Sequence, residues 1–282
     1  MKQQSGKVYL DKDACLFREY ITGVLNKVNQ EGAYSSFAPA DALSFSSVLF
    51  LLGYQYNKKG LPPEICLILT KRSKKIKQSG DLCCPGGKVA PGLDPILARL
   101  LTLPGFPVAR WPYWSQLLKR QPEKARRLSL FFATSLRESF EELRLNPLGI
   151  RFLGPLPEQR LYAFKRTIYP MVCWIVGQKR FISNCEVEKV VYIPLRDLLN
   201  LDNYACYKIK LSHLAAQKFQ KVKGDYSCFL YKDKKETDIL WGVTFRIVML
   251  FLKYAFGFKT PEISSLPVVI GTLDNNYFTG KD

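Results

Sequence analysis

The stretch SGDLCCPGGKVAPGLD, residues 79–94, carries the strongest local structural signal in the chain. A polar turn leads into a short apolar step, which is followed by Pro85, Gly86 and Gly87 and then by a loop that ends at Asp94. Paired glycines after a strand-like run indicate that the backbone passes close to another group, because a side chain there would not fit. The stretch therefore predicts a tight turn that packs against a second element.

The segment ATSLRESFEELRL, residues 133–145, is the best candidate for that second element. At about 100° per residue it forms an amphipathic helix. Its expected core-facing stripe consists of Leu136, Phe140 and Leu143. The opposite face carries three carboxylates within one turn, Glu138, Glu141 and Glu142. Clustered carboxylates are ligands for Mg²⁺ or Mn²⁺, although a Glu-rich helical face can also simply be solvated.

Together the two stretches resemble the Nudix box, Gly-x5-Glu-x7-Arg-Glu-U-x-Glu-Glu-x-Gly-U, in which U is a bulky aliphatic residue. Gly87 corresponds to its first glycine, and residues 137–142 correspond to its Arg-Glu-U-x-Glu-Glu core. The box has seven residues before its arginine, whereas 42 residues lie between Asp94 and Arg137 here. The resemblance therefore implies a box that is split by an insertion of roughly 35 residues.

Four further segments resemble the coenzyme A diphosphatase branch of the Nudix family, in the same order along the chain. They are LILTKRSKKIKQSGDLCCPGG (67–87), FLGPLPEQRL (152–161), NCEVEKVVYIPLRDLLNLDNY (184–204) and ILWGVTFRIV (239–248). Outside the insertion, the resemblance covers roughly residues 45–255. It implies a metal-dependent diphosphatase that acts on nucleoside diphosphate derivatives.

Four positions depart from the family pattern and weaken the coenzyme A assignment. They are Leu93 for the first Glu of the box, Arg144 for its last Gly, Gln78 or Ser79 for the histidine of the branch, and Cys84 for its apolar-aromatic step. Asp94 is the acid nearest to the first Glu position. A left-handed helix cap at Arg144 would cost about 1 kcal/mol, although Asn146 could absorb that turn.

The resemblance also implies roles for individual residues around the metal. Glu138 and Glu142 would be the principal metal ligands, with Glu141 as a third ligand or catalytic partner. The Gly87 carbonyl would complete the sphere. Arg137 would orient Glu138 through a charge-assisted hydrogen bond.

A general base or further ligand is expected from a loop outside the box, and Glu186 is favoured over Glu188 for this role. The alternative for Glu186 is a loop carboxylate that pairs with Lys189 or Arg180. Substrate phosphates would be bound by Arg72, Lys74 and Gly86. The basic run that contains Arg72 and Lys74 could instead be a solvated loop.

Composition agrees with an anionic ligand. The chain contains 42 Lys and Arg against 24 Asp and Glu, a net charge of +18, which favours nucleotides, coenzymes, nucleic acid or acidic membranes as partners. Eight cysteines without a CxxC pair, and His213 as the single histidine, disfavour zinc and favour reduced thiols in the cytoplasm. No secretory signal is recognised, and Arg246 and Lys253 favour a buried helix over a membrane span at residues 239–258.

We therefore expect an α/β fold, a Nudix-type α/β/α sandwich with a mixed sheet, because strand-like and helical segments are interspersed. Strands are expected in EICLILT, IRFLGPL, YPMVCWIVG and KVVYIPL, and helices in FREYITGVLNKV and in residues 239–256. A helical N-terminal extension would span residues 1–44, the Nudix domain 45–258 and a C-terminal tail 259–282. The insertion at 95–132 would be either a packed helical excursion or an aromatic lid over adenine.

The favoured activity is hydrolysis of coenzyme A or acyl-coenzyme A to 3′,5′-ADP and a 4′-phosphopantetheine product, with Mg²⁺ or Mn²⁺ as cofactor. One alternative keeps the chemistry but changes the substrate to ADP-ribose, a dinucleotide or a nucleoside triphosphate. A second alternative is a non-catalytic Nudix protein that binds nucleotides or RNA. Homodimer formation is left open.

Overall fold

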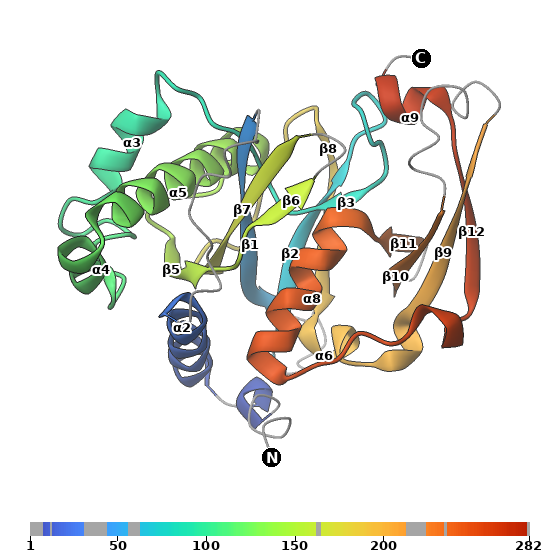
Figure 1. Cartoon of the computed structure of the whole chain (residues 1–282), viewed down its shortest axis with the longest axis horizontal. Helices are drawn as coiled ribbons and strands as arrows, with labels where there is room; N and C mark the ends of the chain where they lie inside the picture. The colour runs from blue at the N-terminus through green and yellow to red at the C-terminus, as the bar shows by residue number, and fades with distance from the viewer. Residues whose placement is uncertain are drawn as a thin grey trace.

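The computed structural model describes residues 8–11, 13–30, 44–55, 63–161, 165–212, 224–233 and 236–280, and the side chains of Val8 and Asp11 lie outside this description, as does His213. The described chain builds two β-sheets with helices around them (Figure 1). This mixture confirms the α/β class expected from the sequence.

The larger sheet has eight strands and is mixed. Its main path runs β3 (Leu82–Cys83), β2 (Glu64–Arg72), β1 (Ser44–Gln55), β7 (Arg166–Ile175) and β5 (Ile150–Pro155). β4 (Gly86–Lys88) pairs with β1, β6 (Gln159–Leu161) with β7, and β8 (Val187–Pro194) with β2. The β1–β7 pair is parallel and the other pairs are antiparallel. All four strands expected from the sequence lie in this sheet.

The central strand β1 is buried on both faces, which explains its continuous apolar run. Leu49 and Leu51 point into one hydrophobic cluster, and Phe50 and Leu52 point into the other. The first cluster is covered by α5 (Pro122–Leu143) with α3 (Asp94–Leu101) and α4 (Trp114–Arg120). The second is covered by α2 (Ala14–Gln30) and α8 (Gly242–Phe256). The result is the expected α/β/α sandwich (Figure 1).

The smaller sheet has the order β11-β10-β9-β12, formed by β11 (Thr237–Leu240), β10 (Gly224–Lys232), β9 (Tyr204–Leu211) and β12 (Val268–Leu273). Its core contains Tyr207, Leu273 and Tyr277, the last from α9 (Asn275–Thr279). Residues 259–282, expected to be a tail, thus supply a strand and a helix. The helix expected from residue 239 begins instead at Gly242, because Ile239 and Leu240 pair with β10.

Short helical elements complete the described chain: η1 (Val8–Asp11), α6 (Leu195–Leu198), η3 (Leu201–Asn203) and η5 (Ile263–Ser265). The expected N-terminal helix is confirmed as α2. It is part of the sandwich, since Phe17, Ile21 and Leu25 are at most 1% exposed. Among the described residues, no helix combines the length and the apolar character that a membrane crossing requires.

The insertion forms α3, α4 and the first turns of α5. Trp111 and Trp114 are buried, and the Trp111 indole donates a hydrogen bond to the Leu153 carbonyl at 3.1 Å. Phe131 stacks on Tyr169 with a ring-centroid distance of 3.8 Å. The two tryptophans are core residues, so they do not form the open stacking surface that an aromatic lid would require.

Candidate active site

The paired glycines meet the carboxylate helix, as the sequence predicts. β4 lies against β1, with Gly86 opposite Val48 and Gly87 opposite Ser47. A Cβ on Gly86, whose φ is +149°, would lie 2.3 Å from the Ser47 carbonyl oxygen. A Cβ on Gly87 would lie 2.4 Å from Cδ of Glu138 on α5. At Gly86 the neighbouring backbone leaves no space for a side chain, whereas a side chain at Gly87 would displace the Glu138 carboxylate from its present position.

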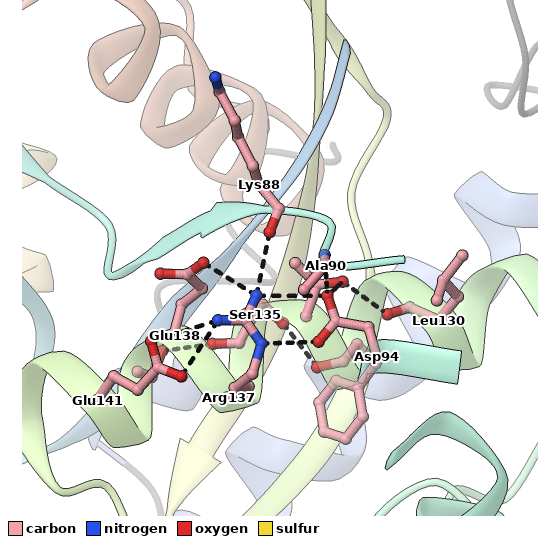
Figure 2. Close-up of polar contacts among 11 residues, drawn as sticks. Lys88, Ala90, Asp94, Leu130, Ser135, Arg137, Glu138 and Glu141 are labelled. Atoms are coloured by element: carbon pink, nitrogen blue, oxygen red, sulfur yellow. Dashed lines mark hydrogen bonds and ion pairs between the residues drawn. The ribbon is translucent and has the colours of Figure 1, made fainter. Parts of the chain in front are cut away.

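The Arg137 side chain connects the glycine turn to α5 through several hydrogen bonds (Figure 2). Its Nε donates to Asp94 Oδ1 at 2.7 Å, and its Nη2 donates to Glu138 Oε1 and to the Lys88 carbonyl, both at 3.0 Å. Its Nη1 contacts both Glu141 oxygens at 3.2 and 3.3 Å. The hydrogen bond expected between Arg137 and Glu138 is therefore present, and Glu141 is held by the same guanidinium.

Asp94 forms more contacts at the site than the sequence suggested. Its side chain is fully buried and accepts hydrogen bonds from the Ala90 amide at 2.7 Å and the Thr134 hydroxyl at 2.8 Å, besides those from Arg137. Burial disfavours its charge, but the hydrogen bonds outweigh burial and hold the pKa of Asp94 below its usual value. Asp94, the acid beside Leu93, is thus the buried partner of Arg137.

Glu142 is the most strongly perturbed acid of the carboxylate helix. Burial raises its pKa to about 8, helped by the nearby charges of Glu138 and Glu186. Arg72 and a hydrogen bond from the Gly86 amide oppose this rise. Burial also raises the pKa of Glu138. Carboxylates from two separate segments are thus crowded at the end of α5.

Glu186 reaches this place because its loop runs beside the end of α5. The Asn184 amide donates to the Glu142 carbonyl at 2.9 Å, and the Asn184 side chain accepts from the Glu186 amide at 2.9 Å. The Glu186 side chain is exposed. Lys189, offered by the sequence as its ion-pair partner, instead contacts Glu236 and Asp238. Glu188 contacts Lys71 at 3.4 Å.

Of the two basic residues expected to bind substrate, Arg72 lies at the site. Its charge acts on Glu142, and its Nε donates to the Lys77 carbonyl at 2.9 Å. The next residue, Ser73, donates its amide to the Glu186 carbonyl at 2.8 Å. Lys74 is exposed in the loop that follows. Gly86 faces Glu142 through its amide, so in this structure its N–H is directed at the carboxylate.

A polar contact that sequence reasoning missed ties this loop to the smaller sheet. Asp81 accepts a hydrogen bond from the Tyr277 hydroxyl at 2.6 Å and from the Trp241 indole at 3.0 Å. The Gln78 amide donates to the Tyr277 carbonyl at 2.6 Å. Burial raises the pKa of Asp81 to about 6, against the two side-chain hydrogen bonds and the charge of Arg72. No local pattern signals a contact across 196 positions.

Two expectations about the carboxylate helix are wrong. Phe140 does not face the core, since it is 43% exposed and lies under the Arg144 guanidinium at 5.1 Å. Ser139 is buried in its place, and its hydroxyl donates to the Ser135 carbonyl at 2.7 Å. The left-handed turn at the helix end falls on Arg144 itself, with φ +52° and ψ +40°, and not on Asn146.

The donor atoms at this site are of the kind that hard divalent cations take. They are carboxylate oxygens and, at the glycine turn, backbone carbonyls. Within the described ranges, no three Asp, Glu, His or Cys side chains already surround a single point as metal ligands would. Burial raises the pKa of Glu142, and the nearby charges of Glu138 and Glu186 add to this rise. The oxygen donor atoms of the site are therefore suited to Mg²⁺ or Mn²⁺.

No protein-family model and no curated protein sequence matches the chain. Solved structures show a weak likeness to it. A C. elegans Ap4A hydrolase binary complex is 12% identical over 56% of this chain and 84% of its own, with a TM-score of 0.35. The Nudix domain of Shewanella oneidensis NrtR in complex with ADP ribose is 17% identical over 58% and 82%, with a TM-score of 0.33. A MutT/nudix family protein from Enterococcus faecalis is 13% identical over 86% and 74%, with a TM-score of 0.37.

Proposed function

We propose that the chain is a Nudix-type diphosphatase, which hydrolyses the pyrophosphate bond of a nucleoside diphosphate derivative with the help of Mg²⁺ or Mn²⁺. The observation that carries this proposal is the meeting of Glu138 and Glu142 on α5, the glycine turn, and Glu186 from a separate loop. These groups are distant in the sequence and gather at one end of one helix. A merely solvated Glu-rich face would not need a glycine turn packed so closely that a Cβ on Gly87 would displace the Glu138 carboxylate.

Glu138 and Glu142 are the residues that would hold the cation, with the Gly87 carbonyl beside them. Glu141 is a weaker candidate, because both of its oxygens contact Arg137. When bound, such a cation neutralises pyrophosphate charge and lowers the pKa of water. Arg137 positions Glu138, and Asp94 in turn fixes Arg137 from the buried side.

Glu186 is the proposed general base or additional ligand. It is exposed, its carboxylate acts on Glu142, and its loop is anchored to the end of α5 through Asn184. A base must be reachable by substrate and water while its backbone stays fixed, and this position meets both needs. Replacing Glu186 by Gln should lower turnover at least about tenfold without changing thermal unfolding. Unchanged turnover would remove Glu186 from the mechanism.

Among substrates, we propose coenzyme A or an acyl-coenzyme A. Support comes from the branch-like segments and from Arg72, which stands beside Glu142 and leads into an exposed loop that carries Lys74, Lys75 and Lys77. Guanidinium and ammonium groups there could recognise an extra phosphate such as the 3′-phosphate of coenzyme A. Charge reversal at Arg72 or Lys74 should then abolish a preference for coenzyme A over its dephospho form.

The decisive experiment compares hydrolysis of coenzyme A, ADP-ribose and NADH in Mg²⁺ and in Mn²⁺. The variants are Glu142→Gln and, as a matched control on the same helix, Glu123→Gln, whose side chain is 75% exposed and pairs with Arg126. We expect metal-dependent release of 3′,5′-ADP that is lost in the first variant and kept in the second.

Hydrolysis of another diphosphate alone would keep the chemistry but reject coenzyme A. If the protein hydrolyses none of the three and instead binds RNA in a salt-sensitive way, the non-catalytic alternative holds and the proposed activity is refuted.

A further inference from the structure

A second basic site lies away from the carboxylates, where the insertion meets α2 and the edge strand β5. A cleft of about 400 Å³ is lined there by three arginines from three separate segments, Arg18, Arg110 and Arg151. Glu19 is the only acidic residue in its lining. None of the residues assigned to the candidate active site contributes to it. Its elements lie at the left of the molecule, around the labels α2, β5 and α4 (Figure 1).

The three guanidinium groups outnumber the acidic group in the lining, which is that of Glu19. In the part of the chain that the structure describes, none of them forms an ion pair within 4 Å, whereas Arg137 binds three carboxylates and Arg126 binds Glu123. Three like charges at one concave surface raise the local potential and favour an anion. A cleft of this composition is thus electrostatically complementary to a ligand with two or more negative charges.

Two of the arginines are held by other contacts. The Arg18 guanidinium lies over the Trp174 ring at 5.7 Å, and Arg110 Nη2 donates to the Leu148 carbonyl at 3.5 Å. Arg151 stands on β5, where the alternation of the strand turns its side chain outward. Part of the entropy cost of ordering long side chains around an anion is therefore already met by the fold.

The remainder of the lining is apolar or aromatic. It comprises Pro107, Pro112, Tyr113, Phe152 and Leu153, with the small side chains Cys15 and Thr22. The volume lies in the range of small-molecule sites, about 300–1,000 Å³. Guanidinium groups beside an aromatic ring suit a molecule that has both a phosphate group and a flat apolar part.

We propose that this cleft binds a phosphorylated small molecule of nucleotide size, at a site distinct from the candidate active site. The proposal does not depend on the proposed hydrolase activity. It gives a ligand-binding role to the insertion, because Pro107, Arg110, Pro112 and Tyr113 all come from it.

The test is calorimetric titration with ADP in EDTA, which removes metal-dependent binding at the carboxylate site. The test variant is the double substitution Arg110→Ala with Arg151→Ala, since both side chains are exposed and their loss should leave the fold intact. Arg126→Ala is the control for loss of a surface arginine, and Glu142→Gln is the control for the carboxylate site. Thermal unfolding of each variant verifies folding.

We expect one saturable site for ADP that the double substitution weakens about tenfold or more and that both controls retain. Pyrophosphate should compete with ADP at this site, because the guanidinium groups recognise the phosphates. The proposal is overturned if ADP does not bind in EDTA, if the folded double variant binds it as tightly as the parent, or if Glu142→Gln abolishes the binding.

Discussion

Replacing Asp94 by Asn should destabilise the protein by about 3 kcal/mol. Oδ1 of Asp94 accepts from Arg137 Nε, and Oδ2 accepts from Ala90 N, Thr134 Oγ1 and Arg137 Nη2. An amide has only one acceptor oxygen, so in either orientation its NH₂ group faces at least one donor inside a fully buried site. The loss combines a charge-assisted hydrogen bond of about 1.5–3 kcal/mol with an unsatisfied donor. Arg137 keeps Glu138 and Glu141, which limits the cost.

The measurement is urea and thermal unfolding without added metal, with Asp225→Asn as the control. Asp225 forms an exposed ion pair with Lys208 at 3.7 Å, which should contribute less than about 1 kcal/mol. A loss of 3 kcal/mol corresponds to about 5 °C in Tm for a chain of 282 residues. The reasoning is refuted if Asp94→Asn unfolds within about 1 kcal/mol of the parent, or if the control costs as much.

The contact between Asp94 and Arg137 also makes the stability of the fold depend on pH, in a direction that can be predicted. Because the folded state lowers the pKa of Asp94, its ionised form stabilises the fold above its ordinary pKa, and this stability is lost as the pH falls through the folded pKa. The difference in unfolding free energy between the parent and Asp94→Asn should therefore be full at neutral pH. This difference in unfolding free energy should narrow once the pH drops below 3.8, the ordinary pKa of an Asp side chain.

Three further substitutions test the fold around the site. Arg144→Gly should stabilise the protein by about 0.5–1 kcal/mol in urea unfolding, because glycine adopts the left-handed turn without strain; a loss would show that the contact with Phe140 outweighs the strain. Asp81→Asn should flatten the dependence of the unfolding free energy on pH. Because the fold raises the pKa of Asp81 from 3.8 to about 6, the parent should lose about 3 kcal/mol of stability as the pH rises between these values. Parallel plots of unfolding free energy against pH for the parent and the variant would contradict this. Trp111→Phe should cost about 1–3 kcal/mol through the lost bond to the Leu153 carbonyl, and unchanged stability would contradict a core role.

The elements that could be predicted from the sequence are those whose own residues determine their secondary structure. The apolar runs of β2, β5, β7 and β8 and the apolar spacing of α2 needed only local patterns, and the paired glycines correctly announced a close approach. Gly86 and Gly87 meet Ser47 and Glu138 because no Cβ is there. The resemblance to the Nudix box implied the hydrogen bond between Arg137 and Glu138, which is present.

Other features could not be predicted, because they depend on partners far along the chain. Phe140 and Ser139 are neighbours on the helix, and only the distance between α5 and the sheet decides that serine is the buried one. The same holds for Asp81, whose partners Trp241 and Tyr277 follow 160 and 196 residues later. The residues of β12 read as a tail because their hydrogen-bond partner is β9, in a sheet that no local pattern announces.

The hydrogen bond between Asp94 and Thr134 spans 40 positions, and it has a consequence for the order of folding. Closing a loop of that length costs only about 1.4 kcal/mol more in entropy than closing one of 8 residues. The insertion at residues 95–132 therefore adds little to the entropy cost of folding. Its helices α3 and α4 pack on α5, and such helix–helix contacts tend to form faster than strand pairings between distant parts of a chain. The docking of α3 on α5 places Asp94 against Arg137, which in turn contacts Glu138 and Glu141. Amide hydrogen exchange should therefore show α3 and the first half of α5 protected no later than the turn at residues 85–88.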